Sequence, residues 1–98
     1  MYIHLGKDFI VKKEKIIGIF DMDNTTSSKS TRAFLSESEE NGLLISATDD
    51  IPRSFIVCDE DMLDGSVKTI VYLSALSPKT LKKRSNENVF EQISKGNI

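Results

Sequence analysis

Two carboxylates spaced two residues apart, Asp21 and Asp23, follow an apolar run, and Thr25 follows them at the same spacing. In this pattern one carboxylate can attack a phosphoryl group while the other transfers a proton. Such chemistry needs Mg²⁺, held by both carboxyl groups, to offset the negative charge of the phosphate. The motif therefore raises the hypothesis of a metal-dependent aspartyl phosphatase.

The elements that must position this chemistry do not fit into so short a chain. The pattern resembles the first motif of haloacid-dehalogenase-type phosphatases, whose site lies at the carboxyl ends of several parallel strands in a doubly wound sheet. A chain of 98 residues forms one small domain. The acidic clusters at 49–50 and 59–61 do not follow an apolar strand that leads into a helix. Residues 21–28 therefore predict a hydrogen-bonded loop that caps the next helix.

Other side chains that ligate metals or act as nucleophiles form no recognisable site. His4 has no second histidine or cysteine at ligand spacing. Residues 59–64 lack the twelve-residue loop of a calcium site and its terminal glutamate. Cys58 lies in an apolar run and is expected to be a small buried side chain. We expect no catalytic residue, no metal site and no cofactor.

The composition is that of an ordinary soluble domain, with 39% hydrophobic and 29% charged residues. No apolar run approaches the ~20 residues of a membrane-spanning helix, and residues 1–6 show no signal peptide. The single cysteine cannot form an internal disulfide. A cytoplasmic protein without membrane contact is the expectation.

Charge is unevenly distributed, although the net charge is only −2. Residues 1–20 carry four basic and two acidic side chains, residues 21–65 carry three and eleven, and residues 66–98 carry six and two. Basic residues cluster at 12–15 and at 79–84. This asymmetry indicates either a basic binding face or merely solvated surface, with residues 82–84 complementing a helix dipole.

Apolar runs and turn residues predict an α+β fold with a small, mostly antiparallel sheet, one central helix and a short C-terminal helix. Strands are expected at 2–5, 9–11 and 16–20, and the third is expected to be central and buried because it is apolar on both faces. The central helix spans 29–41 and stops at Asn41-Gly42.

The second half of the chain predicts a short strand at 43–45 and a hairpin of strands 54–58 and 67–73, joined by an acidic turn at 59–65. Ser77 and Pro78 fit the start of a helix that runs to about Arg84. We assign residues 1–84 to one domain and 85–98 to a C-terminal extension, with a short helix and a frayed end.

Three stretches together resemble a known family: residues 1–6, residues 16–21 and residues 73–84, which read MYIHLG, IIGIFD and LSALSPKTLKKR. Their order and spacing are similar to the bacterial extracellular-matrix regulator family of RemA and RemB proteins, closest to its RemB branch, over residues 1–84. The Phe20-Asp21 passage falls within this resemblance. The resemblance implies a ring-forming α+β domain that regulates biofilm-matrix genes, in a family whose RemA-type members bind DNA.

The family's basic positions carry over only in part. A basic residue before the third strand falls on Lys15, and an arginine before the fourth strand falls on Arg53, but the basic pair preceding that arginine falls on Asp50 and Ile51. We expect a homo-oligomer that binds duplex DNA weakly through its phosphates. The expected DNA-binding residues are Lys12, Lys13, Lys15 and Arg53, followed by Lys82, Lys83 and Arg84.

A function from another class stays open beside DNA binding and the phosphatase. The same ring can be a structural or protein-interaction module that contacts no DNA and acts through a related regulator protein. The dependence of binding on salt discriminates between the two, because phosphate contacts release counterions.

Overall fold

The computed structural model describes residues 1–25 and 28–85. The elements follow in the order β1 (Tyr2–Gly6), β2 (Phe9–Lys12), the 3₁₀ helix η1 (Lys13–Lys15), β3 (Ile16–Asp21), α1 (Met22–Thr25), α2 (Lys29–Glu40), β4 (Leu44–Ser46), β5 (Ser54–Asp61) and β6 (Val67–Ser74). Residues 78–85 are also helical. Apart from residue 85, the predicted C-terminal extension lies outside the described residues.

The strands of the described residues form two sheets, which confirms the α+β class and corrects the predicted single sheet. β1 and β2 pair as an antiparallel hairpin. The four-stranded sheet has the order β3-β5-β6-β4, in which β5 is antiparallel to both neighbours and β4 is parallel to β6. α2 connects β3 to β4, which lie at opposite edges of this sheet and run in the same direction. This crossover places β4 parallel to β6 and gives the sheet its mixed character.

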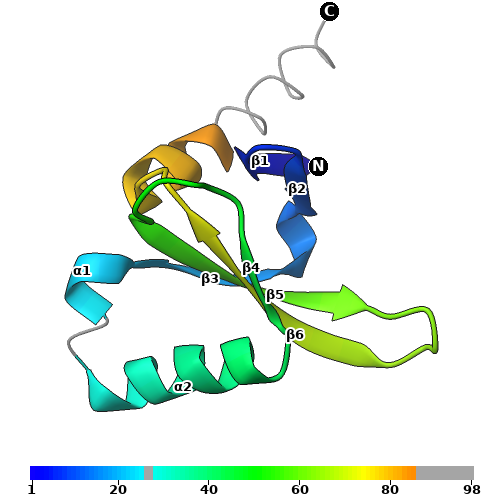
Figure 1. The fold of residues 1–98 in the computed structure, drawn as a ribbon. Helices are drawn as coiled ribbons and strands as arrows, with labels where there is room; N and C mark the ends of the chain where they lie inside the picture. The colour runs from blue at the N-terminus through cyan, green and yellow to red at the C-terminus, as the bar shows by residue number, and fades with distance from the viewer. Residues whose placement is uncertain (26–27, 86–98) are drawn as a thin grey trace, which may run out of the picture.

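The four-stranded sheet is the middle of three layers (Figure 1). Side chains alternate along its central strands. Ile56 and Cys58 on β5 face the β1–β2 hairpin and Leu81 of the helix at 78–85. Phe55 and Val57 face the other way, where α2 contributes Leu35. The basic N-terminal hairpin and α2 therefore lie on opposite faces of the sheet.

The prediction of a central, buried third strand is wrong. In the described part of the chain β3 lies at an edge of the sheet, and Ile17 is 59% exposed. β5 takes the central position because residues 54–58 are all buried. The register shifts between Ile16, which pairs with Cys58, and Gly18, which pairs with Val57. Ile17 is thus the extra residue of a β-bulge.

The predicted acidic turn at 59–65 is partly strand. β5 continues to Asp61, and Asp59 pairs with Thr69 while Glu60 pairs with Lys68. β3 pairs with β5 only as far as Cys58, so residues 59–69 form a two-stranded ribbon, here called the hairpin arm, that projects from the sheet (Figure 1). Acidic residues fit this strand because water reaches them on the ribbon.

The helix boundaries follow the predicted caps. The Ser28 hydroxyl accepts a hydrogen bond from the backbone N–H of Thr31 at the start of α2, and Gly42 follows its end with φ of 70°. Ser77 accepts from the backbone N–H of Thr80 at 3.2 Å, as expected for the start of the last helix.

Candidate binding surfaces

The carboxylate motif spans the end of β3 and the short helix α1, so the loop predicted at 21–28 is partly helical. Asp21 ends β3, and its Oδ1 accepts a hydrogen bond from the backbone N–H of Asp23 at 2.7 Å. β3 runs antiparallel to its neighbour β5, so its carboxyl end meets the beginning of β5. Within residues 1–25 and 28–85 there is no cluster of three acidic, histidine or cysteine side chains that could hold a metal ion. The geometry gives Asp21 a structural role at the start of α1, where its carboxylate accepts from a backbone N–H of the helix.

The first predicted basic segment follows the hairpin. Lys12 ends β2 and is exposed, Lys13 begins η1, and Lys15 ends it. Lys15 Nζ lies 3.0 Å from Oδ2 of Asp61, the last residue of β5 on the hairpin arm. The hydrogen bond that Lys15 donates to Asp61 raises the pKa of Lys15, and neighbouring acidic residues add to the effect. Lys12 and Lys13 therefore present more of their positive charge to a partner than Lys15 does.

The second basic segment is tied to the same hairpin. Leu81 is fully buried and anchors the last described helix, while Lys82, Lys83 and Arg84 are exposed. Arg84 Nη1 donates a hydrogen bond to the backbone oxygen of His4 at 3.3 Å. Since Lys12 pairs with Tyr2, two residues before His4, about 7 Å along the hairpin separates Lys12 from the backbone group that Arg84 contacts.

Arg53 lies apart from Lys15. It precedes β5, and its backbone bonds to Ser74 and Met22. Lys15 lies near the other end of β5, because the next residue, Ile16, pairs with Cys58. Five or six residues of strand correspond to about 15–20 Å. The structure therefore brings residues 12–15 and 82–84 to one hairpin but leaves Arg53 outside that group.

Acidic side chains face part of the basic surface. A hollow of about 400 Å³ is lined by Arg84, Lys7, Asp49 and Asp50, among others. Lys7 Nζ is 2.6 Å from Asp49 Oδ1. The loop in which the resemblance implies a basic pair thus carries carboxylates beside Arg84. These carboxylates reduce the positive potential that a phosphate would meet there.

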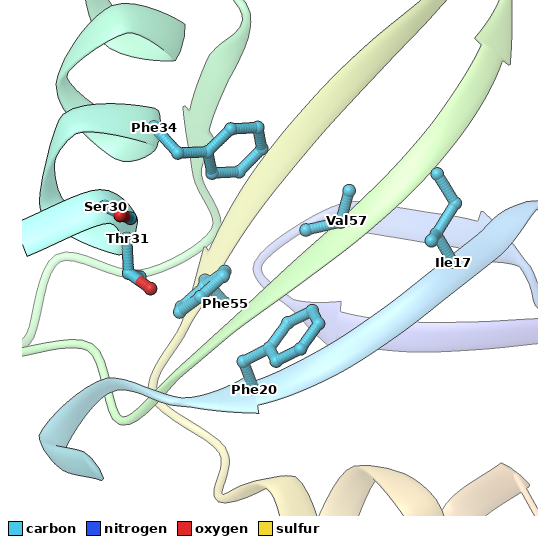
Figure 2. A pocket seen from close by; sticks show the side chains of 7 residues that line it. All are labelled: Ile17, Phe20, Ser30, Thr31, Phe34, Phe55 and Val57. Carbon is cyan, nitrogen blue, oxygen red and sulfur yellow. The ribbon is translucent and has the colours of Figure 1, made fainter. Parts of the chain in front are cut away.

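The sequence interpretation missed an apolar groove between β3, β5 and α2 (Figure 2). It has a volume of about 320 Å³, and its lining residues are Ile17, Phe20, Ser30, Thr31, Phe34, Phe55 and Val57. Phe20 and Phe34 are 37% and 39% exposed. The Phe20 ring stacks on Phe55 with centroids 5.0 Å apart. The groove is therefore an accessible surface with a buried apolar floor.

The β-bulge creates this groove. In a regular strand Ile17 and Phe20 would point to opposite faces. The extra residue turns Ile17 to the face of Phe20, which pairs with Phe55. Gly18 leaves room for the Phe20 ring, because a Cβ there would lie 2.6 Å from two ring carbons. A lone glycine inside a strand pattern is the sequence signal that could have revealed the bulge.

Fold and surface together define a small α+β domain that presents basic segments on one face of its sheet and an apolar groove on the other. Residues 2–84 match the RemA-like family, described as extracellular matrix regulatory protein A-like. The chain is 34% identical over 85 residues to extracellular matrix regulatory protein B of Bacillus subtilis strain 168, covering 87% of this chain and 90% of that protein.

The chain belongs to this RemA-like family of extracellular matrix regulatory proteins, which confirms the resemblance inferred from the sequence. The family name indicates a regulatory role. Among the described residues, no helix has the length and apolar character needed to cross a membrane.

Proposed function

We propose that this chain is a homo-oligomeric regulator of extracellular-matrix genes that binds duplex DNA weakly through phosphate contacts. One observation supports this function above the others. The basic segments at 12–15 and 82–84 are far apart in sequence but flank one two-stranded sheet, joined by the Arg84 bond to His4. A separation of about 7 Å along the hairpin allows both to reach phosphates of one duplex, whose charges are spaced about 3.4 Å apart along the helix axis on each strand.

The same geometry explains why the contact is weak in each subunit. Asp61 holds Lys15, and the carboxylates of Asp49 and Asp50 lie in one hollow with Arg84. Phosphate contacts orient a duplex but do not read its bases. Repetition of the contact in a closed oligomer raises the effective concentration of the remaining subunits once one has bound.

Anisotropy of a labelled random duplex, titrated at ~50 and ~200 mM salt, tests this function. Affinity should fall steeply with salt, and the slope should become shallower when Lys12→Gln and Arg84→Gln are combined. Lys68→Gln is the matched control, since it removes an exposed lysine on the hairpin arm. Absence of binding at the lower salt concentration, or equal salt slopes for both variants, would contradict the proposal.

A gain-of-charge variant gives a second test in the opposite direction. Asp50→Lys removes a carboxylate from the hollow beside Arg84 and adds a cation there. We expect tighter DNA binding and a steeper salt slope than for the parent chain. An unchanged affinity would place the duplex on another surface.

The apolar groove favours a second candidate, a protein-interaction module without DNA contact. In that case a related regulator protein would complete the assembly, and duplex titrations would show no binding at any salt concentration. The Lys12 and Arg84 substitutions would then leave regulation unchanged.

A further inference from the structure

The described structure exposes an apolar groove and, at a different place, a projecting apolar tip. One is the groove described above. The other is Leu63 at the tip of the hairpin arm, which is fully exposed, together with Val67, which is 59% exposed. We propose that the arm tip of one copy binds in the groove of a second copy. This inference rests on the oligomer of the proposed function and assigns its contact surfaces.

The groove suits an aliphatic side chain. Phe55 and Val57 form a buried floor, while Ile17 and Phe34 stand at its open sides (Figure 2). Leu63 projects from the turn that joins β5 to β6, beyond the last residues paired with β3. Contact would remove apolar surface of both copies from water.

Charge complementarity favours a second copy as the occupant. The arm carries Asp59, Glu60, Asp61 and Asp64 against the single base Lys68. On the groove side, Lys29 and Arg32 flank the lining residues of the first half of α2, and the acidic residues follow in its second half, beginning with Glu37. The acidic arm tip is attracted to the first half of α2 and repelled by its second half, and this difference orients the arm in the groove.

The arm of a chain does not reach its own groove. Val57 lines the groove, and the paired ribbon carries the chain four residues further to Asp61, about 13 Å, before the turn that holds Leu63. The contact is therefore between copies and joins two different surfaces. Such head-to-tail contacts close into a ring when their rotation allows it. The bulge in β3 also opposes direct strand pairing at this edge, which leaves side-chain docking as the mode of contact.

This arrangement leaves most of the basic residues away from the contact. The groove lies on the α2 face of the sheet, whereas the N-terminal hairpin and the last described helix pack on the other face. Lys15 is the exception, because it pairs with Asp61 on the arm, two residues before Leu63. Assembly and DNA binding can thus use separate surfaces and be tested separately.

Light-scattering mass across a concentration series is the first test. Leu63→Asp and Phe34→Asp should each shift the chain toward monomer, because each places a charge in the apolar contact. Ile51→Asp is the matched control, since Ile51 is 87% exposed and lines neither surface. Thermal melts of each variant show whether the fold is kept, and Leu63→Asp at an exposed tip should melt with the parent chain.

Disulfide trapping tests the contact directly. Leu63→Cys and Ile17→Cys, purified separately and oxidised as a mixture, should form linked dimers that neither variant forms alone. Native Cys58 is fully buried and does not compete. Ile51→Cys in place of Ile17→Cys should give no linked dimer.

The outcomes separate this inference from the proposed function. An oligomer that survives Leu63→Asp, with no trapped dimer, overturns the contact but leaves an oligomeric regulator standing. A parent chain that is monomeric at every concentration overturns both. DNA binding that persists in a monomeric Leu63→Asp variant, at reduced affinity, supports both.

Discussion

The hydroxyl of Ser74 joins the two sheets, and its removal should destabilise the protein strongly. Ser74 is fully buried at the end of β6, and its Oγ donates a hydrogen bond to the backbone oxygen of Leu5 in β1 at 2.6 Å. The same oxygen accepts from the backbone N–H of Leu76 at 3.1 Å. Ser74→Ala would therefore remove the partner of two backbone groups at once.

The magnitude follows from the burial of those groups. A buried polar group that loses its partner costs about 1–3 kcal/mol, which applies to the carbonyl of Leu5, whose residue is 1% exposed. The half-buried N–H of Leu76 recovers part of its bond from water, so it adds about 0.5–1.5 kcal/mol. We expect Ser74→Ala to lower the free energy of unfolding by about 2–4 kcal/mol in total.

Urea and thermal unfolding followed by circular dichroism measure this loss. For a domain of this size each kcal/mol lowers the midpoint by about 4–8 °C, so the variant should melt roughly 10–25 °C below the parent chain. Ser66→Ala is the control, because Ser66 is exposed on the arm and its Oγ bonds only locally to Asp64. It should change stability by less than about 0.5 kcal/mol. Equal melting of the two variants would refute the role assigned to Ser74.

Four further predictions concern three other positions. Burial raises the pKa of Cys58 from 9.0 to about 12, so its thiol should resist a disulfide reagent until the chain unfolds; rapid reaction of the folded protein would contradict this. The thiol of the unfolded chain ionises above pH 9.0, while the thiol of the folded chain stays protonated up to about pH 12. The free energy of unfolding measured in urea should therefore fall as the pH rises from 9.0 toward 12, and it should fall less for Cys58→Ala. Gly6→Ala should destabilise by about 1–3 kcal/mol in urea melts, since φ is 134° and a Cβ would lie 2.6 Å from the oxygen of Ala47; a parent-like midpoint would argue against this strain. Lys15→Met should leave the melting midpoint at neutral pH nearly unchanged, because the ion pair of Lys15 with Asp61 is exposed. The pKa of Lys15 is raised, so the small stabilisation from this pair is present below the usual lysine pKa and is lost only in alkali.

Local signals in the sequence located most of the elements. Ser28 and Gly42 bracket α2 to within one residue of the predicted span, because caps act on neighbouring backbone groups. The apolar runs located the strands for a similar reason, since alternation with a period of two is a property of the chain itself. The burial of Cys58 was also predictable from its apolar neighbours.

The acidic run at 59–61 shows where local reasoning failed. Acidic residues after an apolar strand are typical of a turn, yet here they extend β5 into the arm. The ribbon pairs half-buried Glu60 with exposed Lys68, and the hydroxyl of Tyr72 donates a hydrogen bond to the Glu60 carboxylate at 3.3 Å, so the strand gives this charge both an opposite charge and a donor. Whether residues 59–61 form a strand or a turn is decided by the partner strand and not by their composition.

The sequence by itself determined the family, the α+β class and two basic segments as local clusters. The tertiary structure alone decided that these segments share one hairpin, that Arg53 lies apart from Lys15, and that Ile17 faces the apolar groove. The reason is that strand order and register depend on pairs such as Ile16 with Cys58, far apart along the chain. A shift of one residue in such a pair moves a side chain to the other face of the sheet, and no local pattern encodes that shift.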